Sequence, residues 1–169
     1  AVGEQIENLV KELDKAGDTL GGIIAGGIKN APAGWGEPVF DKLEAELGKA
    51  MLSIPAVKGV SFGSGFEGVA MKGSEHNDPF TFSQGKITTQ TNHSGGIQGG
   101  ISNGEEIRFK LAFKPVSSVK QIQQTVSRSG EEVAFQQERG RHDVFVLPRA
   151  LPVVEAMAAI VLADMWLRD

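Results

Sequence analysis

Residues 107–114 read Ile-Arg-Phe-Lys-Leu-Ala-Phe-Lys, an alternation of apolar and mostly basic side chains. Successive residues of a β-strand point to opposite faces, so this period of two predicts a strand over residues 106–114. One face is apolar and comprises Ile107, Phe109, Leu111 and Phe113. The other face is basic and carries Arg108, Lys110 and Lys114. The sequence therefore predicts a strand half buried in a core, with cations on its outer side.

Helical and strand patterns lie on both sides of this strand. Apolar residues at helical spacing predict helices over residues 4–16, 38–53 and 149–167. β-Branched and Gly-bounded stretches predict strands over 19–30, as a pair within 58–72, over 87–91 and as a hairpin within 121–138. Because the strands come in antiparallel-looking pairs and the helices are few, we expect an α+β fold. In this fold antiparallel sheets pack with a few helices, and residues 1–169 form a single domain.

Composition excludes several function classes. The 169 residues include no cysteine, which excludes disulfides, thiolate nucleophiles and cysteine-ligated metals and fits a reducing compartment. The net charge of −4 argues against nucleic-acid partners. We see no run of about 18 apolar residues and no signal peptide, so we expect no membrane contact and a cytoplasmic location.

The charges are unevenly distributed along the chain. Residues 1–86 carry eight basic and twelve acidic side chains, whereas residues 108–149 carry eight basic and only four acidic ones. A local net charge of +4 in an acidic chain indicates either an anionic ligand or a solvated strand face. Charge alone leaves both readings open.

A glycine-rich segment precedes the basic strand. Five glycines lie within residues 95–104, where glycine permits positive φ angles and a close approach of the backbone to a ligand. The basic strand is followed by Lys114-Pro115-Val116-Ser117-Ser118, whose ammonium group and two hydroxyls suit a phosphate. The alternative is a long structural loop whose glycines serve tight turns only.

A third cluster, Arg141-His142-Asp143, lies between a polar hairpin and an apolar helix. Arginine can clamp a phosphate or carboxylate, while histidine and aspartate can move protons. A salt-bridged turn is the equally simple alternative. No metal site is predicted, because His76, His93 and His142 are not spaced for a helix-borne site.

Three shorter motifs carry little weight. Residues 63–68 match G-x-G-x-x-G, but neither the helix nor the acidic residue of a dinucleotide site follows, so we interpret them as a turn. The sequon Asn92-His93-Ser94 lacks a secretory context. The S-x-x-K match at Ser117–Lys120 lacks the partners of a β-lactamase-type enzyme.

Taken together, these clusters resemble the chorismate synthase family. Residues 94–104 resemble its second signature, and residues 140–143 with 147–157 resemble its third. Supporting matches are residues 34–43, 53–59 and 73–78. The resemblance runs from about Gly17 to Leu167 and implies part of the family's β-α-β sandwich.

The family eliminates phosphate and a proton from 5-enolpyruvylshikimate-3-phosphate to give chorismate, and it requires reduced FMN. The resemblance implies that the flavin contacts are Pro55, Ala56, Gly99, Lys114, Pro115, Val116, Ser117, Ser118 and Arg141. It also implies that Asp143 is a catalytic acid near the flavin and that Arg141 binds the anionic substrate. The implied partners are a phosphorylated small molecule and further copies of the chain in a homo-oligomer.

The sequence departs from the family pattern in two places. Val144-Phe145 replace the usual Pro-Cys, and the first signature, Gly-Glu-Ser-His-Gly, is absent together with the region of the two catalytic histidines. We therefore expect the C-terminal half of a chorismate synthase, inactive without its N-terminal half. The alternative is a non-catalytic half-domain that keeps the fold and that binds flavin, if at all, through self-association.

Overall fold

The structure is a computed structural model that describes residues 2–83, 85–137, 140 and 142–168. It combines helices with antiparallel sheets, which confirms the predicted α+β class. The chain divides into two compact units. Unit 1 comprises Ala1–Gly22 and Lys114–Arg149, and unit 2 comprises Ile23–Phe113 and Ala150–Asp169. The single domain expected from the sequence stays a prediction, and each unit is described by itself.

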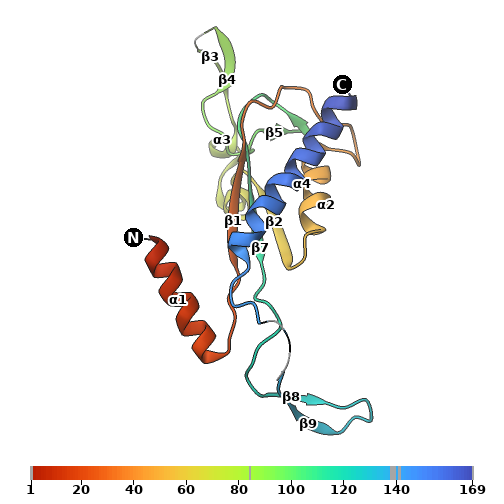
Figure 1. Ribbon diagram of the computed structural model, residues 1–169. Helices are drawn as coiled ribbons and strands as arrows, with labels where there is room; N and C mark the ends of the chain where they lie inside the picture. The colour runs from red at the N-terminus through yellow and green to blue at the C-terminus, as the bar shows by residue number, and fades with distance from the viewer. Residues whose placement is uncertain (1, 84, 138–139, 141, 169) are drawn as a thin grey trace. The chain divides into compact units, whose positions relative to one another are not determined.

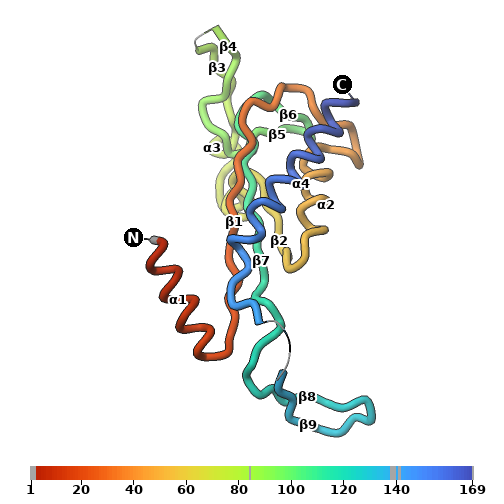
Figure 2. Tube along the Cα trace, viewed as in Figure 1, coloured from red at the N-terminus to blue at the C-terminus, as the bar shows by residue number. Residues whose placement is uncertain are grey.

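Unit 2 is built on a three-stranded sheet in the order β1-β7-β2. Its strands are β1 (Gly22–Ile28), β7 (Ile107–Phe113) and β2 (Val57–Phe62), whose chains run side by side in Figure 2. β2 pairs antiparallel with β7, with Val60 opposite Leu111. Burial along β7 alternates at every residue, so the predicted half-buried strand is confirmed.

Two helices cover the apolar face of β7 (Figure 1). They are α2 (Leu43–Leu52) and the part of α4 (Leu147–Arg168) that begins at Ala150. The core they form with the sheet comprises Ala31, Leu43, Leu47, Ile97, Ile107, Val161 and Met165. Complete burial of Leu43, Leu47 and Ile107 removes them from water, which is the main force that stabilises unit 2.

Two sequence predictions are wrong in this unit. The second helix begins at Leu43 rather than residue 38, because the Glu37 amide bonds the Asp41 carbonyl and the Leu43 amide bonds the Gly100 carbonyl. The stretch after β2 is not a strand but the 3-10 helix η1 (Gly65–Ala70), with i to i+3 hydrogen bonds.

Short elements complete unit 2. The one-turn helix α3 (Gly73–His76) precedes a hairpin of β3 (Phe80–Ser83) and β4 (Lys86–Thr89). β4 matches the strand predicted over residues 87–91, while β3 was not predicted. The glycine-rich segment folds as a small hairpin of β5 (Ile97–Gln98) and β6 (Ile101–Ser102).

Unit 1 contains α1 (Val2–Ala16), which ends as predicted at Gly17, where φ is 65°. The hairpin predicted around Ser129-Gly130 is present as β8 (Gln123–Val126) and β9 (Glu132–Phe135). A single parallel bridge joins Leu20 to Phe145.

α4 is long and apolar enough to cross a membrane by length and composition alone, with 22 residues and a best window of mean hydropathy 1.8. Core helices of folded domains meet the same criterion. Its buried side chains Val154, Ala158, Val161 and Met165 recur every three or four residues, as expected for a helix with one face against a sheet. The absence of a membrane contact stays a prediction.

Candidate functional site

The predicted phosphate-binding segment, Lys114–Ser118, lies in unit 1 directly after β7. The Thr19 hydroxyl donates a hydrogen bond of 2.7 Å to the Val116 carbonyl. Thr19 is only 7% exposed, and its own amide donates to the Asp18 carboxylate at 2.8 Å. The segment is therefore attached to the chain that follows α1 by side-chain hydrogen bonds rather than by a sheet.

The donor groups of this segment face solvent. Lys114 and Ser117 are exposed, and Ser118 is half-buried. Within the described part of the chain, no carboxylate forms an ion pair with Lys114. The segment thus carries one ammonium group and two adjacent hydroxyls, which are the kinds of donor that bind a phosphate group.

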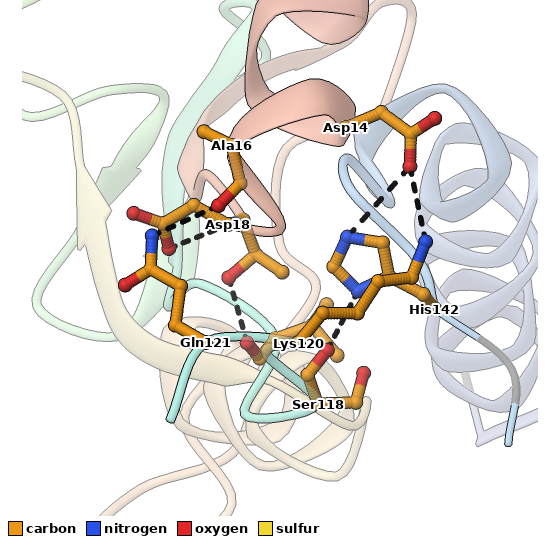
Figure 3. A network of polar contacts seen from close by, with 9 residues as sticks. Asp14, Ala16, Asp18, Ser118, Lys120, Gln121 and His142 are labelled. Atoms are coloured by element: carbon orange, nitrogen blue, oxygen red, sulfur yellow. Dashed lines mark hydrogen bonds and ion pairs between the residues drawn. The ribbon is translucent and has the colours of Figure 1, made fainter. Parts of the chain in front are cut away.

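His142 joins this segment to the end of α1 (Figure 3). Its Nδ1 lies 2.7 Å from the Ser118 carbonyl oxygen, and its Nε2 lies 4.0 Å from Asp14 Oδ1. The same Asp14 oxygen accepts from Lys120 Nζ at 3.4 Å, and the Lys120 amide donates to the Gly17 carbonyl at 2.8 Å. Residues 14–19, 116–120 and 142 thus form one polar network.

Asp143, the predicted catalytic acid, forms an ion pair of 2.6 Å with Arg149 in the first turn of α4. Its side chain is 30% exposed, so the carboxylate is both oriented by a guanidinium group and open to solvent. The two interpretations of this cluster, a salt-bridged turn and a group that moves protons, are therefore compatible at Asp143. Arg141, predicted to bind flavin and substrate, lies outside the described residues.

Pro55 and Ala56, predicted flavin contacts in unit 2, form the turn between α2 and β2. The Val57 amide donates to the Ile54 carbonyl at 3.2 Å, which closes a four-residue turn with proline at its second position. Ala56 has φ of 72°, the left-handed region that costs a residue with a side chain about 1 kcal/mol. Unusual backbone of this kind is enriched at functional sites.

The glycines of residues 95–104 serve two different purposes. Gly95 approaches Gly63 so closely that a Cβ on either residue would collide with backbone atoms of the other segment. In contrast, a Cβ on Gly99 would meet no atom of the described chain within 4 Å, and this residue is exposed at the tip of the β5–β6 hairpin. Structural packing explains Gly95, whereas Gly99, with φ of 60°, forms the turn between β5 and β6 and has its backbone open to space.

Asp78 anchors the start of the glycine-rich segment. Its carboxylate accepts hydrogen bonds from the Thr91 hydroxyl at 2.7 Å and from the amides of His93 and Ser94, each at 2.8 Å. Burial alone would raise the pKa of Asp78, but these hydrogen bonds outweigh it and lower the pKa from 3.8 to about 2. The side chain therefore stays ionised and caps the loop instead of binding a cation.

Other cavities and clusters do not coincide with the predicted site. A cavity of about 350 Å³ lies between β1 and α4 in unit 2, lined by Ile24, Phe109, Val154, Glu155 and other residues outside the predicted set. Ser64 Oγ lies 2.8 Å from His76 Nε2, and the His76 and His93 rings are 5.6 Å apart. Among the described residues, no group of three or more His, Cys, Asp or Glu side chains could hold a metal ion.

The sequence analysis missed Asp14, Thr19 and Asp78 as residues that hold the site. The Thr19–Val116 bond joins residues 97 positions apart, so no local pattern could have shown it. Asp78 ends one of the supporting family matches, residues 73–78, and its three donors lie 13 to 16 residues further along the chain.

Comparison with known proteins identifies the family. A family model described as chorismate synthase matches residues 1–167. The chorismate synthase of Christiangramia forsetii is 60% identical over 168 residues, which cover 99% of this chain and 46% of the relative. That of Opitutus terrae is 58% identical over 160 residues, covering 95% and 44% respectively.

A crystal structure of chorismate synthase superimposes with a TM-score of 0.79 at 32% sequence identity, covering 98% of this chain and 43% of the solved one. The chain thus spans less than half the length of the proteins it matches. Because the family model and the structural match each extend over nearly the whole chain, the chain belongs to the chorismate synthase family.

Proposed function

We propose that this chain supplies flavin contacts to a chorismate synthase. The complete enzyme would eliminate phosphate and a proton from 5-enolpyruvylshikimate-3-phosphate to give chorismate, with reduced FMN as cofactor. The chain matches 44% to 46% of the length of its two relatives above, so the whole reaction is assigned to an assembly that includes the rest of the enzyme.

The observation that carries the proposal is the donor set at Lys114–Ser118. An unpaired lysine and two serines stand together on a segment whose carbonyls are held by Thr19 and His142. A held backbone that presents free donors is the arrangement that binds a phosphate without a large ordering cost. The exposed backbone at Gly99 and the left-handed backbone at Ala56 support flavin contacts in unit 2.

Most of the predicted residues have a part in this chemistry. Lys114, Ser117 and Ser118 bind the cofactor phosphate, Pro55, Ala56 and Gly99 contact the flavin, and Arg149 orients the Asp143 carboxylate for proton handling. Reduced flavin, when bound, supplies electron density as the substrate's phosphate leaves. Cations such as Arg141 stabilise the charge on the departing group. A homo-oligomer and a cytoplasmic location belong to the same proposal.

Titration with FMN and with riboflavin, which lacks the phosphate, tests the proposal. We expect FMN to bind more tightly than riboflavin, and Lys114→Gln to weaken FMN binding by roughly tenfold, since one charge-assisted hydrogen bond is lost. Riboflavin affinity should not change. Lys86→Gln removes an exposed lysine from the β3–β4 hairpin and serves as the matched control. Equal affinity of the wild type for FMN and riboflavin would contradict the phosphate assignment.

A second candidate is a non-catalytic half-domain that associates with itself. The observation that favours it is exposed apolar surface, with Ile6 and Leu9 on α1 and Ile160 and Trp166 on α4 at 41% to 68% exposure. Phosphate release from the substrate with reduced FMN separates the two candidates. We expect no turnover by this chain alone, and turnover restored when the N-terminal half of a relative is added. Turnover without that half would show that the absent histidines are not required.

A further inference from the structure

The His142 ring is a buried titratable group that the proposed chemistry does not use. Its side chain is 6% exposed. Nδ1 lies 2.7 Å from the Ser118 carbonyl oxygen, and a carbonyl oxygen can only accept. Nδ1 therefore carries a proton and donates a hydrogen bond to the backbone of the phosphate-binding segment.

The other ring nitrogen faces α1. Nε2 makes no hydrogen bond with any described residue and lies 4.0 Å from Asp14 Oδ1. Lys120 Nζ lies 3.4 Å from the same carboxylate oxygen and forms an ion pair with it (Figure 3). The ring therefore fills the space between Ser118 and the end of α1, and its one close hydrogen bond is the bond to Ser118.

Two carbonyls of the segment are held from the side, Val116 by Thr19 and Ser118 by His142. Because the peptide unit is planar, a fixed carbonyl also fixes the plane in which it lies. Ser117 stands between the two held carbonyls, and its own carbonyl accepts a hydrogen bond from the Val119 amide at 3.0 Å, so the backbone on both sides of Ser117 is held. Ser118 carries one of the held carbonyls, and Lys114 lies two residues before Val116 on the same segment.

We propose that His142 is a positioning residue for flavin binding: its Nδ1–H holds the Ser118 carbonyl and so aims the donors of Lys114–Ser118 at the cofactor phosphate. This inference rests on the proposed function, because it assigns the segment to the FMN phosphate. His142 touches neither flavin nor substrate in this role.

A matched pair of variants tests the role. In His142→Asn the side-chain amide nitrogen takes the place of Nδ1 and keeps the donor. In His142→Leu the side chain has nearly the shape of asparagine but no donor. We expect His142→Leu to weaken FMN binding by roughly tenfold, the value of one hydrogen bond to a part-buried carbonyl, and His142→Asn to stay within about threefold of wild type. Riboflavin affinity should be the same in all three proteins.

Hydrogen exchange of the Lys120 amide, which donates to Gly17, gives a readout that needs no flavin. We expect faster exchange in His142→Leu and wild-type exchange in His142→Asn. If this exchange pattern is seen while wild type binds no FMN, the positioning of the segment stands and the flavin function fails. If the two variants agree in exchange and in FMN affinity, or if His142→Leu weakens FMN and riboflavin binding equally, the positioning role is wrong.

Discussion

In unit 2 the buried residues are mostly apolar and include Leu43, Leu47, Ile107 and Leu111, each at 0% exposure. In unit 1, by contrast, Val144 and Leu147 are the buried apolar residues of the described chain, and each is 9% exposed. The predicted phosphate-binding segment of unit 1 is held by hydrogen bonds to its carbonyls. Unit 2 is therefore held together by an apolar core, whereas the position of the donors in unit 1 depends on a few polar side chains.

The largest expected effect comes from the apolar core of unit 2. Leu47→Ala should lower the free energy of unfolding by about 2–5 kcal/mol, since it removes a fully buried side chain and leaves a cavity. Urea denaturation measures the change, and Leu52→Ala, on the same helix but 54% exposed, is the control and should cost much less. Equal losses from the two variants would show that this core does not dominate the stability of unit 2.

A smaller loss of stability is expected from Asp78, the polar side chain that anchors the glycine-rich segment of unit 2. The pKa of Asp78 in the folded state, about 2, lies below its usual 3.8, so its contribution is present above pH 4 and is lost as the pH falls toward 2. Asp78→Asn should cost about 2 kcal/mol at neutral pH and progressively less in acid. Thermal unfolding from pH 7 to pH 2 measures this difference. A constant difference between wild type and variant at every pH would contradict the assignment.

The smallest expected effect tests the polar attachment of unit 1. Thr19→Val keeps the side-chain shape but removes the hydroxyl that donates to Val116, at a cost of about 1 kcal/mol. Thr19→Ser keeps the hydroxyl and is the control. Chemical denaturation measures both, and hydrogen exchange at Val119 and Lys120 should rise in Thr19→Val only. Unchanged exchange would mean that the segment is not held through Thr19.

The sequence predicted the elements whose pattern is local. The alternation over residues 107–113, the helical spacing of α1 and α4, and the turn at Gly130 each carry their structure within a few residues. The start of α2 was predicted too early, since it is set by the Gly100 carbonyl, 57 residues from the Leu43 amide that bonds it. Such a bond leaves no trace in a local pattern.

In the candidate site, too, the sequence indicates the residues whose type suggests a function, but it does not show the long-range bonds that hold them. Residue types at Lys114–Ser118 indicate phosphate chemistry, and the family resemblance supplies the assignment of Pro55, Ala56 and Gly99, but neither shows what holds these residues in place. Thr19, His142 and Asp78 act through backbone carbonyls and amides, and many residue types at many positions could do so. His142 was singled out in the sequence as a group that could move protons, but only the folded arrangement shows the backbone bonds that these three residues make.

The close approach of Gly63 and Gly95 has a consequence for redesign of this scaffold. A side chain on either residue meets the backbone of the other segment, so no compensating change at the partner, already the smallest residue, can restore the fit. The two positions therefore have to be kept as a pair in any library, circular permutant or transplanted loop. A survey that ranks positions by intolerance to substitution would rank both glycines as high as the cofactor contacts. Their intolerance, however, comes from the short distance between two backbones and not from a role in binding or catalysis.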